Sequence, residues 1–397
     1  MDIRKLILRI PGEWEDAWLY RENLLVWDCG GALYYLPVER LLESVALAAD
    51  HHHKVLAEHL ILRSSRKSTS EIRDMLAIPS VRRELFAPLK DAPEVIIQIN
   101  PADLRRSAVE PIPGNITDTV AYGNRIFATS DEGIYETQFS PRHEQASPLL
   151  QVVDNPTTAI VAGNGIFAAS LGEHGLRSRE IRFGDGIEWI QTAKDSKFET
   201  LAEYSRTVTR ASMHLMNYGE SPLPEFIRAS TRRERRDKGF TESIVFDFDN
   251  PYSIEPLLER ALGLPSLQGN VTNGSRFEVL GNANYRLLLQ VGPEVQVLNI
   301  RAFRNEPFQL KKTAHFDIDS MMTHPIGRAM STQALRSGFL VEHTSGVHIL
   351  SESGAIELAD ELVVQARTYP NSRRYVDTVT LVKDRSLDLI GFIDLST

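Results

Sequence analysis

The sequence predicts an all-β protein, a β-propeller of about seven four-stranded blades that is closed by its N- and C-terminal strands and interrupted by a helical insertion. Three observations support this. A short motif recurs along the chain, strand–turn–strand units fill most of the 397 residues, and both ends are apolar and strand-like. No apolar run approaches the roughly 18 residues that a membrane span needs.

The recurring motif is clearest in two copies. "AYGNRIFATSDEG" begins at Ala121 and "VAGNGIFAASLGEHG" at Val161, and a looser copy, "VLGNANYRLLLQVGPE", begins at Val279. In each, an alternating apolar stretch meets a Gly-Asn or similar turn, and a second apolar stretch meets a turn that contains glycine. This pattern predicts three-stranded antiparallel meanders.

Four further units bring the total to seven, and they begin at Asp16, Arg206, Gln333 and Asp377. One blade buries only one face against its neighbours, so we expect the blades to close into a ring. The segment "IRKLILRI" from Ile3 has no partner of its own. We therefore expect it to complete the blade that contains the C-terminal strands.

Trp27-Asp28 is the signature dipeptide of WD repeats, and the repeated units cover most of the chain. In this respect the sequence resembles irregular WD-repeat-like propellers, although it lacks their Gly-His element. The resemblance implies the architecture and a role as an interaction platform, and no functional residues carry over. A stand-alone propeller with a helical insertion also resembles the accessory regulators of prokaryotic signalling or defence systems. This resemblance implies that the chain holds a partner protein, such as an effector or a transcription factor, in an inactive state.

A helical insertion is expected at residues 39–92, between a first segment, 1–38, and the remaining blades in 93–397. Apolar residues recur there at helical spacing, which predicts two or three helices on the propeller rim. We expect Leu41, Val45, Leu56 and Leu60 to leave an apolar stripe for a partner, because a short helical pair hides little apolar surface by itself. Deleting the insertion should then spare the fold and abolish partner binding.

A second interruption, at residues 219–241, is expected to be a loop. Six cations fall within eleven residues there, namely Arg228, Arg232, Arg233, Arg235, Arg236 and Lys238. Their mutual repulsion and the lack of apolar anchors predict disorder in the free protein. We expect a contact for an acidic partner or a site that a protease cuts first, and a solvated hairpin loop is the alternative interpretation.

No catalytic motif is complete in the sequence. "GNGIFA" at 163–168 matches a dinucleotide-binding pattern, but β-type residues follow it, so a hairpin turn is favoured. The adjacent His51, His52 and His53 would point about 100° apart on a helix and could not converge on one ion. His52 and His59 share a face but lack a third ligand.

Two pairs of carboxylates remain as candidates, Asp247 with Asp249 and Asp317 with Asp319. Each pair lies on one strand face, where it could bind Ca²⁺ or mark the start of a turn. A metal-dependent hydrolase or lyase that works in the propeller channel is therefore the alternative function.

The net charge and the cysteine content exclude further classes of function. The net charge of −9 argues against general nucleic-acid binding. Cys29 is the only cysteine, so no intramolecular disulfide can form, and its apolar neighbours predict a buried, inert thiol. The opening residues lack a signal-peptide pattern, so a cytoplasmic protein is expected. The sequence thus predicts a non-enzymatic, cofactor-free scaffold or regulatory subunit that binds a protein partner.

Overall fold

The computed structural model describes most of the chain, and the structural statements below concern that part. The described residues are 3–62, 74–139, 148–163, 165–181, 190–191, 197–211, 214–220, 224–236, 239–253, 258, 260–261, 278–283, 286–291, 294–301, 309–317, 329–335, 338–351, 354–370, 372 and 374–395.

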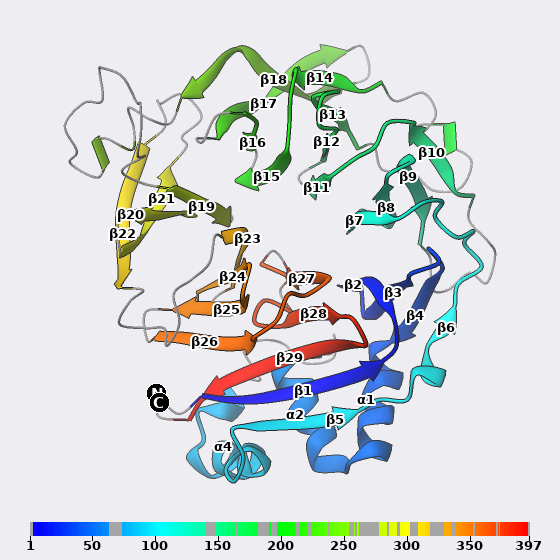
Figure 1. Cartoon of the computed structure of the whole chain (residues 1–397), viewed down its shortest axis with the longest axis vertical. Coiled ribbons are helices and arrows are strands. Elements are labelled where there is room, and N and C mark those ends of the chain that lie inside the picture. The colour runs from blue at the N-terminus through cyan, green and yellow to red at the C-terminus, as the bar shows by residue number, and fades with distance from the viewer. Residues whose placement is uncertain are drawn as a thin grey trace. The chain divides into compact units, whose positions relative to one another are not determined.

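The described strands pair into seven sheets, six of four strands and one of five. The chain is therefore a seven-bladed β-propeller, as the repeats predict. Figure 1 labels its strands. Its blades belong to two compact units, which are described one at a time. The first comprises residues 1–111 and 324–397, and the second comprises residues 112–323.

The first unit holds three blades. One contains β2 (Trp14–Tyr20), β3 (Asn23–Asp28), β4 (Leu33–Pro37) and β6 (Arg105–Arg106). Another contains β23 (Ala329–Ala334), β24 (Phe339–His343), β25 (Gly346–Ser351) and β26 (Gly354–Ala359). The closing blade has the order β27 (Gln365–Thr368), β28 (Val379–Lys383), β29 (Ser386–Asp394), β1 (Ile3–Pro11) and β5 (Glu94–Gln98).

The second unit holds four blades. The first two are β7 (Ile116–Tyr122), β8 (Arg125–Ser130), β9 (Gly133–Gln138) and β10 (Leu150–Val153), then β11 (Ala159–Gly163), β12 (Ile166–Ser170), β13 (Leu176–Glu180) and β14 (Glu199–Ala202). The next contains β15 (Thr207–Ala211), β16 (His214–Tyr218), β17 (Glu225–Arg236) and β18 (Gly239–Ser253). The last contains β19 (Glu278–Ala283), β20 (Arg286–Val291), β21 (Glu294–Arg301) and β22 (Gln309–Asp317). Each predicted repeat unit thus lies in a blade of its own.

The closing blade joins the two ends of the chain, as predicted. β1 pairs antiparallel with β29, from Ile3 opposite Asp394 to Pro11 opposite Ser386. Two pairings were not predicted from the sequence. β5 lies parallel to β1, and β6 supplies the fourth strand of the first blade. Both strands follow the helical insertion, so their partners lie far away in sequence.

Glycines recur in the motif because the blades need them at two turns. Between β7 and β8, Gly123 and Asn124 have φ values of 62° and 65°, the type I′ geometry of tight hairpins. The other turn leads into the third strand of a blade. There a Cβ on Gly133, Gly175 or Gly346 would lie 2.2, 2.0 or 2.2 Å from a carbonyl oxygen at the end of the fourth strand. In three blades, therefore, the glycine at the start of the third strand occupies the same structural position.

The helices lie mainly between β4 and β5. They are α1 (Val38–Ala48), α2 (His51–Leu60), α4 (Pro79–Leu85) and the 3-10 turn η1 (Ala87–Leu89), and a second 3-10 turn, η2 (Pro101–Asp103), follows β5. The Asp50 carboxylate caps α2 by accepting a hydrogen bond from the backbone N–H of His53 at 2.9 Å. Within the first unit, α1 and α2 lie beside the closing blade (Figure 1).

Candidate interaction surfaces

The apolar residues of the insertion are buried, so the prediction of an exposed stripe is wrong. Leu41, Val45 and Leu56 have no exposed surface, and Leu60 packs partly buried against the same core. That core also contains Leu389 of the closing blade. The stripe therefore has its partner within the chain, because the amphipathic helices cover an apolar blade face.

The closing blade is shaped to receive the end of α2. A Cβ on Gly391 of β29 would lie 2.8 Å from the Leu60 Cβ and 2.9 Å from the Leu60 carbonyl oxygen, which is too close for any side chain. Thr378 Oγ1 donates a hydrogen bond to the Ile61 carbonyl oxygen at 2.9 Å. The insertion is therefore built into the core of the first unit.

The basic segment is a strand over most of its length, so the prediction of a disordered loop at 219–241 is wrong for residues 225–236. Five of the six predicted cations stand on β17, namely Arg228, Arg232, Arg233, Arg235 and Arg236. Lys238 lies outside the described residues. Pairing with β18 supplies backbone hydrogen bonds along the segment, and these bonds oppose the repulsion between like charges.

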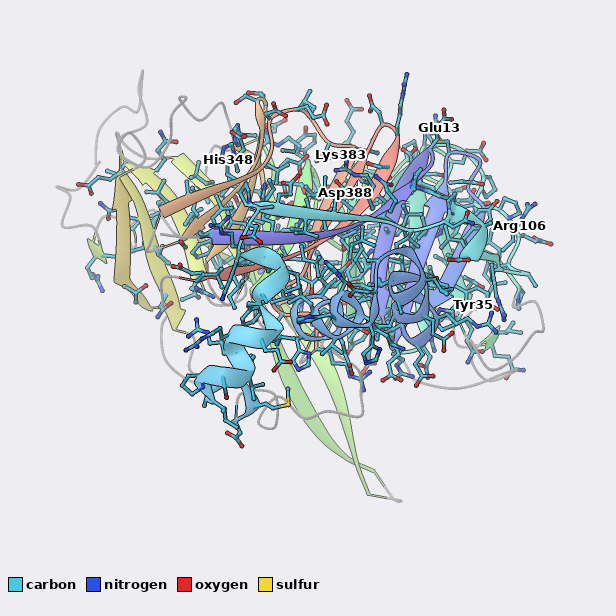
Figure 2. The ribbon with its side chains drawn as sticks, turned by 90° about the horizontal axis from the view of Figure 1, so that it is seen from below. Glu13, Tyr35, Arg106, His348, Lys383 and Asp388 are labelled. Atoms are coloured by element: carbon cyan, nitrogen blue, oxygen red, sulfur yellow. The ribbon has the colours of Figure 1, made fainter. Side chains whose placement is uncertain are left out.

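The β17–β18 hairpin continues well past the rest of its blade. β16 pairs with β17 only from Glu225 to Ile227. β17 and β18 remain paired from Arg228 opposite Asp247 to Arg236 opposite Gly239. We call residues 228–236 and 239–247 the arm. Nine residue pairs of two-stranded ribbon span about 30 Å, and Figure 2 shows the arm as a long pale-green hairpin.

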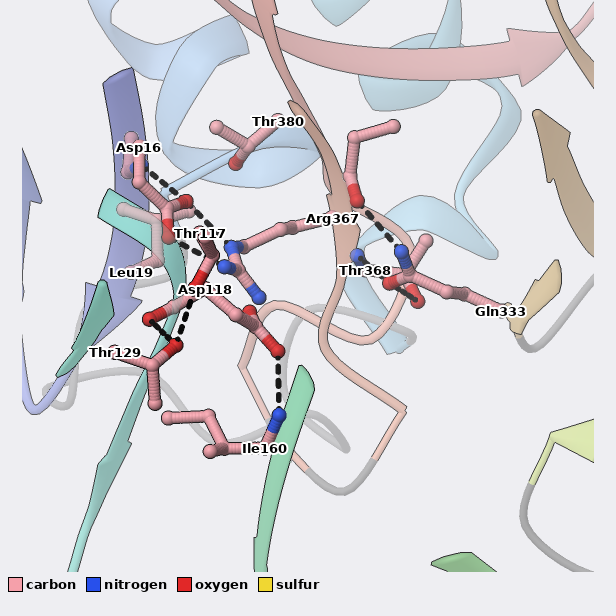
Figure 3. A network of polar contacts seen from close by, with 12 residues as sticks. Asp16, Leu19, Thr117, Asp118, Thr129, Ile160, Gln333, Arg367, Thr368 and Thr380 are labelled. Carbon is pink, nitrogen blue, oxygen red and sulfur yellow. Dashed lines mark hydrogen bonds and ion pairs between the residues drawn. The ribbon is translucent and has the colours of Figure 1, made fainter. Parts of the chain in front are cut away.

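In the first unit, a buried ion pair joins two blades (Figure 3). Arg367 of β27 donates through Nε to Asp16 Oδ1 at 2.6 Å, and its Nη2 donates to the other carboxylate oxygen. The guanidinium carbon lies 4.8 Å from the centroid of the Trp18 ring, a cation–π contact. Asp16 and Arg367 are both buried. These charges are satisfied within the chain, so the pair stabilises the blades against each other.

Further polar contacts surround this pair. The side-chain carbonyl of Gln333 on β23 accepts from the Thr368 N–H at 2.8 Å (Figure 3). The Tyr369 hydroxyl accepts from the Leu19 N–H at 3.1 Å and shares a hydrogen bond of 2.7 Å with the Thr380 hydroxyl. Burial raises the pKa of Tyr369 to about 12. β2, β23 and β27 are thus connected by buried and partly buried polar groups.

The second unit has its own links between blades. Asp118 of β7 accepts a hydrogen bond from the Ile160 N–H of β11 at 2.9 Å, and Thr117 Oγ1 donates to the Thr157 carbonyl at 2.6 Å. Figure 3 shows the contact between Asp118 and Ile160. In both units, then, polar side chains on the first strand of one blade bind the next blade.

A buried charge cluster joins the same two blades. Glu136 accepts a hydrogen bond from Arg125 Nη1 at 2.9 Å and a second from Arg179 Nη2. The Arg179 guanidinium also lies 5.1 Å from the Phe198 ring centroid and 5.7 Å from that of Phe167. All three charged groups are buried, so the cluster serves packing rather than contact with a ligand.

Two histidines form a polar chain on the β24–β25 hairpin. His343 Nε2 and His348 Nδ1 lie 2.7 Å apart, and the rings stack with centroids 4.7 Å apart. His343 Nδ1 lies 2.9 Å from Ser345 Oγ, and His348 Nε2 lies 3.6 Å from Glu357 Oε2. Burial, and then the charge of His348, lowers the pKa of His343 to about 4. The sequence reasoning missed this pair, whose signal is two histidines that flank a tight turn.

His53 and His59 of α2 contact different local partners. His53 Nδ1 lies 2.8 Å from Asp50 Oδ1 at the start of α2, whereas His59 is buried with Nδ1 2.7 Å from the Val55 carbonyl oxygen. Across the described residues, no group of three His, Cys, Asp or Glu side chains could hold a metal ion.

The side chains of the four carboxylate candidates lie outside the described part of the structure. Asp247 and Asp249 stand on β18, and Asp317 ends β22, but their side chains are outside the described set. Asp319 is wholly outside the described residues. The metal-dependent alternative at these positions stays a prediction.

Two smaller predictions are resolved by the strand boundaries. β11 ends at Gly163 and β12 begins at Ile166, so "GNGIFA" is a hairpin, as predicted. Cys29 is exposed, which corrects the expectation of a buried thiol. The reason is that β3 ends at Asp28, which leaves Cys29 in the turn. Partial burial, followed by the nearby Glu15, raises the pKa of this thiol and makes it a weaker nucleophile.

Comparisons with known proteins bear on the fold. No protein-family model matches the sequence, and no curated protein matches it. Among the helices that the structure describes, none is long and apolar enough to cross a membrane.

Solved structures are similar to this chain in architecture. The crystal structure of the β-propeller domain of Myceliophteria thermophila Cps50 (Swd1) aligns with a TM-score of 0.50 and 9% identity, covering 96% of each chain. The WD40 domain of Neurospora crassa Pan2 aligns with a TM-score of 0.41 and 8% identity, covering 96% of this chain and 89% of the other. Identities this low show the fold alone, and the match to the Cps50 domain agrees with the β-propeller architecture of this chain.

Proposed function

We propose that this chain is a non-enzymatic scaffold or regulatory subunit, and that its arm binds an acidic, extended segment of a partner protein. WD40-type propellers generally mediate protein–protein interactions and are typically non-enzymatic scaffolds. That general role supports the class of function. The arm supports the place of contact.

The pairing of β17 carries the proposal. From Arg228 to Arg236, β17 pairs with β18 on one side, and no other described strand pairs with its second edge. An isolated two-stranded ribbon is marginally stable in water, and three strands are usually needed. An unpaired edge presents N–H and C=O groups to which an extended segment can add. A partner strand on β17 would complete a three-stranded sheet.

The charge of β17 favours an acidic partner. Its arm portion carries five arginines and one glutamate, whereas the whole chain has a net charge of −9. A second copy of β17 placed on this edge would bring arginines close to arginines, which is unfavourable. A strand rich in Asp and Glu would reduce the repulsion that is already present in β17. Cleavage of the arm by a protease would end this contact, which gives a route for regulation.

The test compares two altered arms with the wild-type chain. In the first, residues 231–244 are replaced by Asn-Gly, so that Ser230 opposite Val245 becomes the last pair before a type I′ turn. The second is the double variant Arg232→Glu with Arg235→Glu. The matched control is Arg105→Glu with Arg106→Glu, because these two arginines are exposed on β6 (Arg106 is labelled in Figure 2).

Partners are identified by quantitative affinity capture, and the purified partner is then titrated against each form by calorimetry. Both arm variants should bind at least about tenfold more weakly, with the control unchanged. Equal affinity for the shortened arm would contradict the proposal. Robust turnover in a metal-supplemented hydrolase and lyase screen would contradict its non-enzymatic part.

A further inference from the structure

A pocket of about 340 Å³ opens on the helical insertion, between α4, η1 and the last described residue, Leu395. Its apolar wall is formed mainly by Leu76, Pro79, Phe86 and Leu395. Phe86 belongs to the buried core of the first unit, and Leu76 and Leu395 pack against that core while partly exposed. The core therefore fixes the wall of the pocket in place, although its surface faces solvent.

Three cations line the same pocket. Arg82 and Arg83 come from the last turn of α4, and Lys90 follows η1. Arg82 Nη2 donates weakly to the Asp394 carbonyl oxygen at 3.5 Å. Arg83 and Lys90 are exposed, and within the described part of the chain their charged ends have no hydrogen-bond or ion-pair partner. The residues that line the pocket include three cations and no Asp or Glu, so the lining itself is positively charged.

We infer that this pocket, here called the insertion pocket, binds an acidic peptide segment of a partner protein that carries one apolar anchor residue. The anchor side chain would cover Leu76, Phe86 and Leu395. Carboxylates on either side of it would pair with Arg83 and Lys90. The inference rests on the proposed function only in taking the ligand to be part of a partner protein.

Charge and shape both favour this ligand. A chain with a net charge of −9 repels acidic segments in general, so a pocket lined by three cations and by no Asp or Glu directs them to one place. The pocket lies at the low end of the range of about 300–1,000 Å³ typical of ligand sites, which suits a single large side chain. Ile78, which is 49% exposed beside the lining residue Ala77, continues the apolar surface outward. That continuation favours an extended peptide over a small molecule held inside.

The test selects peptides from a random library, about twelve residues long, on the full chain, with counter-selection on the double variant Arg83→Glu with Lys90→Glu. Both residues are exposed, so the variant should fold, and circular dichroism checks that it does. Selected peptides are labelled with fluorescein and titrated by anisotropy. They should place Asp or Glu on both sides of Leu, Ile or Phe.

Binding should weaken at least about tenfold in the double variant, and about as much when the anchor in the peptide becomes Ala. The control Arg105→Glu with Arg106→Glu should bind normally. The inference is overturned if no acidic peptide is selected, or if the double variant binds within about twofold of wild type. Binding of decanoate, with the same dependence on Arg83 and Lys90 but without any selected peptide, would likewise overturn it in favour of a small amphipathic anion.

The shortened arm separates this inference from the proposed function. It should bind the selected peptides as the wild type does, because the insertion pocket contains no residue of the arm. If the arm captures its partner and the pocket selects nothing, the pocket inference alone is wrong. If the pocket binds acidic peptides and the arm variants keep full partner affinity, the proposal for the arm alone is wrong.

Discussion

Arg9 and Asp388 stand opposite each other on the first and last strands of the chain, and their side chains form a two-pronged ion pair. Arg9 Nε donates to Asp388 Oδ1 at 2.7 Å, and Nη2 donates to Oδ2 at 2.8 Å. Asp388 is buried, and Lys383 Nζ lies 4.0 Å from Oδ2; both residues are labelled in Figure 2. The pair therefore stabilises the non-covalent junction between the two ends.

Removing either partner should destabilise the closing blade, but by different amounts. Arg9→Met leaves a buried carboxylate without its main partner and should cost about 3 kcal/mol. Asp388→Asn should cost about 1–2 kcal/mol, because Arg9 is partly exposed and can be hydrated. Urea unfolding followed by circular dichroism measures both. As a control, Glu94→Gln breaks the more exposed Lys5–Glu94 pair and should cost less than about 1 kcal/mol. Equal midpoints for all variants would show that the pair does not secure the junction.

The repeated glycine before the third strand should not tolerate a side chain. Gly175→Ala would place a Cβ 2.0 Å from the Ala202 carbonyl oxygen at a φ of 85°, so strand pairing must shift. We expect a loss of about 3 kcal/mol or more. Gly172→Ala, in the same turn, has a φ of 59° but no atom within 4 Å of the added Cβ, and should cost about 1–2 kcal/mol. Thermal unfolding of the two variants measures both losses of stability. Equal losses would mean that the positive φ, and not the contact with the Ala202 carbonyl oxygen, determines the cost.

These glycines explain why the fold could be predicted from the sequence. Three blades make the same close approach before their third strand, so Gly133, Gly175 and Gly346 recur at equivalent positions. The pairing of β1 with β29 was also predictable, because the N-terminal apolar strand lacked a local partner and the C-terminal end was also apolar and strand-like. Local pattern and closure together determine the architecture.

The surfaces were harder to predict because they depend on contacts between distant segments. Leu41 and Leu56 form an apolar stripe in the sequence, but whether that stripe is covered depends on the closing blade, which includes residues more than 300 positions away. Likewise the arginines of β17 suggest a loop until the facing strand, β18, is known. The insertion pocket needs Leu395 beside α4, and no local pattern signals that contact.

His343 and Glu342, which are neighbours on β24, should make the stability of the fold depend on pH in opposite directions. Burial lowers the pKa of His343 to about 4 from its ordinary value of 6.5, so the unfolded chain takes up a proton first and stability falls as the pH drops through this range. Burial raises the pKa of Glu342 to about 7 from 4.5, partly offset by Arg367. There the folded chain takes up the proton first, so stability rises as the pH drops from about 7 to 4.5.

Single variants separate the two effects. Relative to wild type, Glu342→Gln should lose stability more steeply as the pH drops below about 6.5, because the contribution of His343 then acts without opposition. His343→Gln should show the reverse trend between pH 7 and 4.5. Urea midpoints measured at several pH values test both. If the two variants change stability with pH in the same direction relative to wild type, these assignments are wrong.

The insertion should prove essential to the fold of the first unit. Leu56 has no exposed surface and lies in the core with Leu41 and Leu389, so Leu56→Ala should cost about 2–5 kcal/mol. Leu47, on α1 but 88% exposed, provides the matched control, and Leu47→Ala should change stability by less than about 0.5 kcal/mol. Urea unfolding of both variants measures the difference.

Deletion of residues 39–92 extends the same argument. It would expose the closing-blade face that Leu60 and Ile61 cover, including the surface around Gly391, and leave Thr378 Oγ1 without its acceptor. We therefore expect loss of the cooperative unfolding transition and binding of a hydrophobic dye, rather than an intact propeller that has lost a partner. A deleted chain that unfolds at the wild-type urea midpoint would mean that the closing blade is stable uncovered. The insertion would then be an added module, and Leu56→Ala should destabilise it alone.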